Sequence, residues 1–452
     1  MPPLADPIPL LERGPEEVVC RPASGGEPVT CARFLAEATA LAERLPAGRG
    51  HAMNLCGDRY LALLGFAAAL LRGQVTLLCA DRSPYRLRRL AERYPDAYLL
   101  ADAPVQDVPL PLLRLDDAPP AAAAGASPPP MPRIPAGQVA AIAFTSGSTG
   151  EPTAHAKPWG SLVLGAAAAA ERFGLRHADG PPATVVVTVP PQHMYGFETT
   201  IMLPFRSAAA CLAGETFFPH DVFEALASAP GRRVLVTTPL QLRALLAAEG
   251  GPPVLDAVIS ATAPLAPSLA AAVEAAWGAP VLEIYGATEA GSIASRRTVE
   301  GEGWLPYRGT VLRDGAVAIP GLGEVPLADA VEPLPGGRFR LLGRRADVVK
   351  LGGRRASLAD LNRLLADVEG VQDGVFVAPE DLESNPAARL TAYVVAPGRT
   401  TEEILAALRQ RVEAVFLPRP VVLVPALPRD RLGKLSRHAL AGLRRGGGGE
   451  GP

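Results

Sequence analysis

Three lysines mark the segments of this chain that could carry chemistry, because every other Lys/Arg position is arginine. The chain has 44 such residues, and its lysines are Lys157, Lys350 and Lys434. Lys157 follows a Gly/Ser/Thr loop, Lys350 comes shortly after a Gly-Arg-Arg-Ala-Asp segment, and Lys434 stands within Leu-Gly-Lys. A lysine ammonium is a compact, mobile point charge that can reach a phosphate or carboxylate oxygen. We therefore expect functional positions for all three; the alternative is chance survival in an arginine-biased chain.

The strongest local signal is a run of six small residues directly after an apolar segment at 139–144. The run is Thr145, Ser146, Gly147, Ser148, Thr149 and Gly150. Glycines let the backbone turn its N–H groups inward and hydroxyls add donors, so such a turn can wrap a phosphate. The run lacks the Gly-Lys-Ser/Thr ending of a Walker loop, which disfavours a P-loop kinase or GTPase. A flexible surface loop is the alternative.

Strand-like apolar runs alternate with alanine-rich helical runs before about residue 345, which predicts an α/β fold. The predicted helices span residues 59–71, 221–229, 239–249 and 265–277. The predicted strands span residues 75–79, 139–144, 184–189, 234–237, 257–260 and 281–285. This alternation predicts a largely parallel, doubly wound sheet that binds ligands at the carboxyl ends of its strands.

The pattern changes after about residue 345, where we expect a smaller α+β unit of about a hundred residues. Its predicted helices are 358–368 and 401–415, and its predicted strands are 371–378 and 390–396. Residues 118–135 are almost all Pro, Ala, Gly and Ser, which predicts a linker or surface loop. Residues 446–452 begin with four glycines and are expected to form a disordered tail.

The composition is typical of a globular protein with two or three domains, at 452 residues and 48% hydrophobic content. A formal net charge of −2 gives no electrostatic reason to expect nucleic acid or an anionic membrane as a partner. Five cysteines without CxxC spacing are expected to be buried or free thiols. Residues 1–6 lack the features of a signal peptide, and the longest apolar run, 61–71, is too short to cross a bilayer. We therefore expect a cytoplasmic protein without membrane insertion.

Further motifs follow the Thr145–Gly150 loop in order. They are Pro190-Pro191-Gln192-His193-Met194-Tyr195-Gly196, Tyr285-Gly286-Ala287-Thr288-Glu289, Asp329, Gly343-Arg344 with Asp347 and Lys350, and Gly433-Lys434. From about residue 54 onward this order and spacing resemble the superfamily of adenylate-forming enzymes. That superfamily includes acyl- and aryl-CoA synthetases, the adenylation domains of peptide synthetases, and luciferases. As an ordered set, these motifs are highly specific.

The resemblance implies a fold and a reaction. The fold is a large N-terminal domain of mixed, largely parallel sheets with helices over 1–345, and a small mobile α+β domain over 346–445. A hinge is implied near residues 344–347. In the implied reaction, a carboxylate attacks the α-phosphate of ATP and gives an acyl adenylate and pyrophosphate. The small domain then rotates, and a thiol of CoA or of a carrier protein's phosphopantetheine takes the acyl group.

The resemblance also implies which residues serve the first step. Glu289 would bind Mg²⁺, Thr288 would contact the α-phosphate or the metal shell, and Lys434 would bridge the carboxylate and the α-phosphate. Tyr285 would stack on adenine and Asp329 would hold the ribose. The implied ATP and AMP contacts are Thr145, Ser146, Gly147, Ser148, Thr149, Gly150, Lys157, Ala261, Tyr285, Gly286, Asp329 and Arg344. Ordinary turn or surface positions are the alternative for these residues.

Two further groups of residues are implied, one for the acid and one for the thiol. The acid pocket would include His193, Tyr195, Gly196, Phe197, Ser260 and Ala287. We interpret His193 as a pocket wall, not a general base, because a carboxylate needs no deprotonation at neutral pH. Lys350, Gly352 and Gly353 would form the loop that enters the site for the thiol step; a plain surface turn is the alternative.

The chain departs from the family pattern at three places. Pro152 is followed by Thr153 and Ala154 where the family has Lys-Gly, so Lys157 is interpreted as the residue that reaches back to the pyrophosphate. The usual hinge acid is Ala346, with Asp347 beside it. The stretch between the Glu289 and Asp329 motifs is short, and the whole chain is compact.

These departures disfavour a long-chain fatty acid ligase. The chain resembles compact ligases that load small aromatic acids, such as hydroxybenzoates, onto an acyl carrier protein for aryl-polyene or xanthomonadin-type pigments. The predicted protein is therefore an ATP- and Mg²⁺-dependent acid ligase. One alternative is the same class with free CoA as acceptor, and another is a nucleotide sensor or scaffold on an inactive ligase fold. The joint presence of Glu289, Asp329, Arg344 and Lys434 disfavours the sensor.

Overall fold

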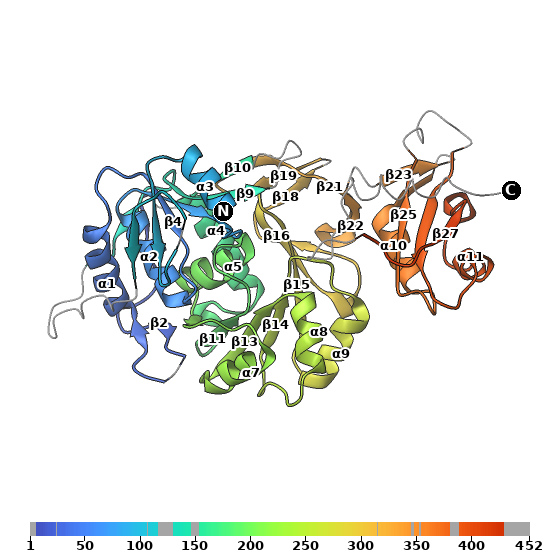
Figure 1. The fold of residues 1–452 in the computed structure, drawn as a ribbon. Coiled ribbons are helices and arrows are strands. Elements are labelled where there is room, and N and C mark those ends of the chain that lie inside the picture. Colours follow the sequence, from blue (N-terminus) through green and yellow to red (C-terminus); the bar gives the residue numbers. More distant parts are fainter. Residues whose placement is uncertain are drawn as a thin grey trace. The chain divides into compact units, whose positions relative to one another are not determined.

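The computed structural model describes residues 6–23, 25–105, 107–115, 130–145, 153–313, 315–344, 348–351, 354–379 and 388–428. The chain forms two compact units, unit 1 (Met1–Val325) and unit 2 (Pro326–Pro452). The residues of each unit can be located in Figure 1 from the residue numbers on its colour bar. Each unit contains its own clusters of buried hydrophobic residues. Helices and parallel-rich sheets make up unit 1, which confirms the predicted α/β fold class.

The first sheet of unit 1 has six strands in the order β10-β9-β5-β4-β6-β7. Its strands are β4 (His51–Asn54), β5 (Val75–Leu78), β6 (Ala97–Ala101), β7 (Leu112–Arg114), β9 (Val139–Thr145) and β10 (Thr153–Pro158). All pairs are parallel except the edge pair of β9 and β10. The carboxyl ends of β5 and β9 therefore lie at the same edge of the sheet, and β10 returns antiparallel from it.

The second sheet has nine strands in the order β17-β16-β15-β14-β13-β11-β12-β2-β3. They are β2 (Val18–Arg21), β3 (Val29–Thr30), β11 (Ala183–Val187), β12 (Ala210–Leu212), β13 (Arg232–Thr237), β14 (Ala257–Ser260), β15 (Val281–Ala287), β16 (Gly291–Arg297) and β17 (Leu305–Pro306). The six strands from β15 to β2 in this order are parallel, whereas the pairs β15–β16, β16–β17 and β2–β3 are antiparallel. Every residue of β11 and β14 is buried, as is typical of strands covered on both faces.

The helices of unit 1 connect these strands. They are α1 (Cys31–Arg44), α2 (Arg59–Leu71), α3 (Pro84–Arg93), α4 (Trp159–Arg172), α5 (Met194–Phe197), the π-helical η2 (Glu198–Met202), α6 (Leu203–Arg206), α7 (Pro219–Ser228), α8 (Pro239–Ala247) and α9 (Pro267–Trp277). Proline stands at the start of α3, α7, α8 and α9, where its missing N–H costs no hydrogen bond. Asp58 caps the start of α2, because its carboxylate accepts a hydrogen bond from the Leu61 N–H at 2.9 Å.

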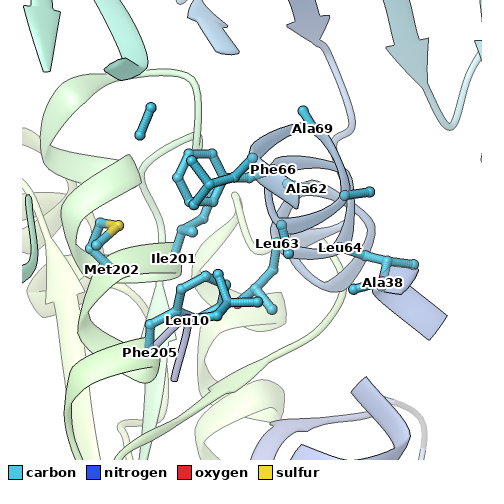
Figure 2. Packing of buried hydrophobic residues seen from close by; sticks show 14 of the residues in the cluster. Leu10, Ala38, Ala62, Leu63, Leu64, Phe66, Ala69, Ile201, Met202 and Phe205 are labelled. Atoms are coloured by element: carbon cyan, nitrogen blue, oxygen red, sulfur yellow. The ribbon is translucent and has the colours of Figure 1, made fainter. Parts of the chain in front are cut away.

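The helix α2 is buried on nearly all sides and holds the segment 194–206 in place. Its Phe66 ring meets the ring of Phe197 edge-on, with centroids 5.0 Å apart, and lies 6.1 Å from that of Phe205. Figure 2 shows Phe66 and Leu63 of α2 facing the helical segment that carries Ile201 and Phe205. This apolar contact fixes the segment that follows His193.

Unit 2 contains two hairpins and a small three-stranded sheet. The strands are β21 (Asp329–Leu334), β22 (Arg338–Arg344), β23 (Val348–Leu351), β24 (Arg354–Ser357), β25 (Asp373–Val377), β26 (Thr391–Val395) and β27 (Val421–Leu423). The helices are α10 (Leu358–Ala366) and α11 (Thr401–Arg409). Three small strands near the boundary are β18 (Val311–Arg313), β19 (Ala316–Ile319) and β20 (Gly323–Pro326).

Two expectations about elements are corrected. The helix predicted over 401–415 ends at Arg409, because the chain must turn back to place β27 beside β26, and Phe416 is buried within that return. The loop predicted over 118–135 contains a short strand at its end: β8 (Arg133–Ile134) pairs with β1 (Ile8–Pro9), and Ile134 is buried. The first part of that loop, 118–129, lies outside the described residues.

Two other expectations concern cysteines and membranes. All five cysteines are buried and free, as predicted. Among the residues that the structure describes, no helix is long and apolar enough to cross a bilayer.

Candidate active site

The β9–β10 hairpin presents the Ser/Thr/Gly run at the edge of the first sheet. Thr145 is the last residue of β9 and pairs with Thr153 of β10, while 146–150 lie outside the described residues. The Thr145 Oγ1 lies 2.9 Å from Nε2 of His155 on β10. Burial lowers the pKa of His155, which favours a neutral imidazole. Its Nε2 can then accept a hydrogen bond from the Thr145 hydroxyl. The hairpin therefore fixes where the run begins.

Lys157 lies two residues further along β10, with its side chain in the interior. Only 2% of its surface is exposed, and Nζ donates a hydrogen bond of 2.6 Å to the main-chain carbonyl of Glu289. Burial lowers the pKa of Lys157 to about 8, although the carboxylates of Glu198 and Glu289 oppose that shift. The interpretation that Lys157 reaches the pyrophosphate finds no support in this geometry, because the ammonium is enclosed and already bonded.

The Tyr-Gly-Ala-Thr-Glu motif covers the end of β15 and the turn that leads to β16. Tyr285 is buried, and its ring centroid lies 5.7 Å from that of Trp304. A Cβ at Gly286 would lie 2.7 Å from the carbonyl oxygen of Gly291, so the two strands approach too closely here for a larger residue. Ala287, Thr288 and Glu289 are partly exposed. The motif thus presents its threonine and its carboxylate beside a buried tyrosine.

A second carboxylate, that of Glu198, binds the end of this turn where β16 begins; it was not predicted from the sequence. Glu198 accepts hydrogen bonds from Ser292 through its N–H at 3.0 Å and its Oγ at 2.6 Å. Burial raises the pKa of Glu198, and the hydrogen bonds from Ser292 act in the opposite direction. Local sequence gave no signal for this contact, because its partners are 94 residues apart.

A cavity of about 170 Å³ lies next to Thr145 and Thr288. Among the predicted site residues it also includes His193, which caps α5 through a hydrogen bond of 3.3 Å from the Tyr195 N–H to Nδ1. Most of the other lining residues were not predicted from the sequence. They come mainly from the ends of β5 and β9 and from α3. The remaining lining residues are Leu78, Cys79, Ala80, Asp81, Arg86, Leu90, Ala143, Phe144, Gln192 and Met194.

The rest of the segment after His193 packs into the interior. The Tyr195 hydroxyl donates to the carbonyls of Ile259 and Thr237 at 3.1 and 3.3 Å, and Phe197 is fully buried against Phe66. A Cβ at Gly196 would lie 2.0 Å from the Pro190 carbonyl oxygen, so glycine permits this close approach. None of these three residues lines the cavity.

The end of β14 supplies two more of the predicted contacts. Ser260 is fully buried, and its Oγ has no hydrogen-bond partner among the described residues. Ala261 is buried and follows at the carboxyl end of the strand, and Thr262 has a backbone φ of 80°. A left-handed conformation is strained for a β-branched residue and often marks a functional loop.

In unit 2 the two residues expected at the ribose lie opposite each other. Asp329 starts β21 and Arg344 ends β22, and the two are direct partners in the antiparallel register. Lys350 lies on β23 opposite Arg355. Gly352, Gly353, Ala346, Asp347 and Lys434 lie outside the described residues, so their assigned roles stay predictions.

The sequence model of a family described as AMP-binding enzyme matches residues 12–319. The chain belongs to this family. Two thirds of the chain lie within the match, including the β9–β10 hairpin, the His193 segment and the Glu289 turn.

Relatives of this AMP-binding enzyme have curated names and solved structures. A 4-coumarate–CoA ligase from Rhodobacter capsulatus is 32% identical over 276 residues, which cover 61% of this chain and 68% of that protein. ATP-bound MatB from Rhodopseudomonas palustris matches with a TM-score of 0.76 at 19% identity, covering 95% of this chain and 96% of that one. O-succinylbenzoate CoA synthetase from Bacillus subtilis, bound to its acyl-adenylate intermediate, matches with a TM-score of 0.75 at 20% identity, covering 94% and 95%.

The family fixes the reaction class of this AMP-binding enzyme. It is an AMP-forming acid–thiol ligase that uses ATP and Mg²⁺. The residues in unit 1 fit these ligands: the Ser/Thr/Gly run follows a parallel strand, and the Glu289 turn offers a partly exposed carboxylate. Mg²⁺ commonly takes one or two protein carboxylates and completes its shell with phosphates and water.

Proposed function

We propose that this ligase activates a small aromatic carboxylic acid of the hydroxybenzoate type and transfers it to the phosphopantetheine thiol of an acyl carrier protein. The observation that carries the choice of acid is the cavity of about 170 Å³ beside Thr145 and Thr288. An apolar cavity of about 150 Å³ is enough to hold a benzene ring. The cavity thus has room for one ring.

The walls of the cavity also suit an aromatic acid that carries a hydroxyl group. Leu78, Phe144 and Met194 offer apolar surface to a ring, while the exposed His193 offers a hydrogen-bonding nitrogen to a ring hydroxyl. Thr145 and Thr288 stand at the side where the α-phosphate is expected. In this proposal the acid's carboxylate points toward these threonines and its ring toward Leu78 and Phe144.

The roles of the remaining residues complete the proposal. Glu289 would hold Mg²⁺, which when bound neutralises charge on the phosphates. Tyr285 would face adenine, and the Asp329–Arg344 pair at the end of its hairpin would bind the ribose and the phosphate. Lys434 would bridge the attacking carboxylate and the α-phosphate. A unit charge pair about 4 Å apart is worth about 4 kcal/mol at an effective dielectric near 20, which is about a thousandfold in rate.

Free CoA is the second candidate acceptor, and the activities of two relatives favour it. The relatives named above include a 4-coumarate–CoA ligase and an O-succinylbenzoate CoA synthetase. The carrier protein is proposed because the chain resembles the carrier-dependent aryl ligases. CoA and a carrier protein present the same phosphopantetheine arm, so the step at the thiol is the same for both.

The test is acid-dependent pyrophosphate release over benzoate, hydroxybenzoates and short, medium and long fatty acids. We expect the largest kcat/KM with a hydroxybenzoate, and a loss of about a thousandfold in the Lys434→Ala variant with ATP binding retained. The acceptor is then identified by comparing thioester formation with CoA and with a phosphopantetheinylated carrier protein.

Two outcomes would contradict the proposal. A fatty acid turned over better than every aromatic acid would show that the cavity is not the acid pocket. Bound ATP with no pyrophosphate release for any acid would favour the nucleotide-sensor alternative.

A further inference from the structure

A buried cation, the ammonium of Lys157, binds the turn that carries Glu289. Lys157 reaches it from β10, 132 residues earlier in the chain, and donates its hydrogen bond to the carbonyl of Glu289 itself. The lysine is 2% exposed, although a lysine is almost never fully buried without a partner. Burying an ammonium costs free energy, and a hydrogen bond to an arbitrary main-chain carbonyl would not offset that cost. This contact therefore indicates that the conformation of this turn has to be fixed.

The same turn is held from its other end by a partly buried carboxylate. Glu198 binds the backbone and the hydroxyl of Ser292, three residues after Glu289. Gly291 lies between the two anchors with a backbone φ of +82°, and a Cβ there would lie 2.6 Å from Oε1 of Glu198. The carboxylate therefore packs directly against the backbone of the turn.

The two charges have opposite signs and hold opposite ends of one turn. The buried ammonium of Lys157 binds the turn at Glu289, and the partly buried carboxylate of Glu198 binds it at Ser292. Their mutual attraction offsets part of the cost of burying each charge. Together they enclose the segment 289–292 between a donor and an acceptor that come from different elements, β10 and η2.

We propose that Lys157 is a positioning residue for Mg²⁺·ATP: its hydrogen bond to the Glu289 carbonyl, opposed by the Glu198–Ser292 contact, fixes the Glu289 carboxylate toward the metal. The inference rests on the proposed role of Glu289 as the metal ligand. Groups that orient a metal ligand typically change metal affinity or activity by about 10–100-fold when they are removed. The lysine contacts neither metal nor nucleotide in this proposal.

The experiment measures how strongly a metal tightens nucleotide binding, which needs no acid and no turnover. Calorimetry gives the dissociation constant of α,β-methylene-ATP with EDTA and with Mn²⁺, and the ratio of the two is the metal coupling. We expect Lys157→Met to reduce this ratio by about tenfold and to leave metal-free binding within about twofold. Methionine is similar in shape and removes only the charge and the donor.

Three variants separate positioning from a general loss of structure. Arg206→Met removes another buried cation that donates to a main-chain carbonyl, that of Pro9 at 3.1 Å, and should keep the wild-type ratio. The double variant Lys157→Met/Glu198→Gln removes both charges and so leaves neither without its partner of opposite sign; it should recover thermal stability over Lys157→Met but not the ratio. Glu289→Gln tests the premise and should lower the ratio at least as far as Lys157→Met does.

The outcomes distinguish the two proposals. A wild-type ratio in both Lys157→Met and the double variant, with a reduced ratio in Glu289→Gln, would overturn the role of Lys157 and leave that of Glu289 intact. A wild-type ratio in Glu289→Gln would overturn both. An equal loss in Arg206→Met would show that the effect is only structural.

Discussion

Gly291 has a backbone conformation, and a short distance to the carboxylate of Glu198, that glycine alone tolerates. Its φ is +82°, and a Cβ would lie 2.6 Å from a carboxylate oxygen of Glu198. The residue stands at the start of β16, directly after the turn that carries Glu289. The geometry of this one residue therefore decides how closely the carboxylate of Glu198 can approach the turn.

We predict that Gly291→Ala destabilises unit 1 by at least about 1–2 kcal/mol, the cost of a left-handed conformation for a residue with a Cβ. All three tryptophans of the chain, Trp159, Trp277 and Trp304, lie in unit 1, so tryptophan fluorescence during urea unfolding follows this unit. The control is Gly165→Ala within α4, where a Cβ meets nothing within 4 Å. Alanine there should stabilise by about 0.5–1 kcal/mol. Equal effects at both positions would contradict the geometry at Gly291.

At the scale of elements, Glu274 joins α9 to the two strands that form the Glu289 turn. Its Oε1 accepts from the Val281 N–H of β15 at 2.8 Å, and Arg297 of β16 donates to both of its oxygens at 3.0 and 2.7 Å. The hydrogen bonds from Arg297 hold the pKa of Glu274 below its usual value of 4.5. This carboxylate connects the helix and the hairpin at the end opposite the turn.

Glu274→Gln is predicted to lower the unfolding free energy of unit 1 at pH 7 by about 1 kcal/mol. A carboxylate whose pKa is depressed by folding adds stability above its unfolded pKa, and this is lost as pH falls through the folded pKa. The difference from wild type should therefore be constant above about pH 5 and shrink below the usual value of 4.5. Urea unfolding at several pH values measures it.

The matched control for this prediction is Glu224→Gln. Its side chain is 76% exposed, and its contact with His220 on the same helix is long, at 4.0 Å. A surface change of this kind should stay within about 0.5 kcal/mol. A Glu274 effect that does not depend on pH would mean that packing, not the ion pair, is lost.

At the scale of the whole molecule, the proposed reaction needs residues from both units. The Ser/Thr/Gly run and Glu289 belong to unit 1, while Asp329, Arg344, Gly353 and Lys434 belong to unit 2. The adenylation step is assigned to Lys434 and the thiol step to the Gly352-Gly353 loop. The two steps should therefore be separable by substitutions within unit 2.

We predict that Gly353→Trp blocks thioester formation and spares adenylation, because the family resemblance assigns the Gly352-Gly353 loop to the channel for the pantetheine arm and Lys434 to the adenylation step. Pyrophosphate release should stay within about twofold of wild type, while thioester formation falls by about a hundredfold or more. Gly137→Trp, at an exposed glycine of unit 1 with open space around it, is the control and should affect neither step. Equal loss of both steps in Gly353→Trp would contradict the alternation of domains.

The sequence by itself determined the local elements and the reaction class. The helix 59–71 and the strand 257–260 have the predicted bounds, because Asp58 caps the helix and the strand is a short, fully apolar run. The ordered motifs identified the adenylate-forming family, since each motif is a local pattern that can be recognised without knowing the fold. Where a bound depended on distant contacts, as in the helix predicted over 401–415, the local pattern was not sufficient.

Only the tertiary structure decided which side chains meet. The sequence singled out Lys157 but assigned it to a phosphate, whereas its partner is a carbonyl 132 residues away. It gave no reason to consider Glu198, and it placed Tyr195 and Phe197 at an acid pocket although both pack into the interior. Strand order and register bring β10, η2 and the Glu289 turn together, and these depend on long-range packing that local residue spacing does not encode.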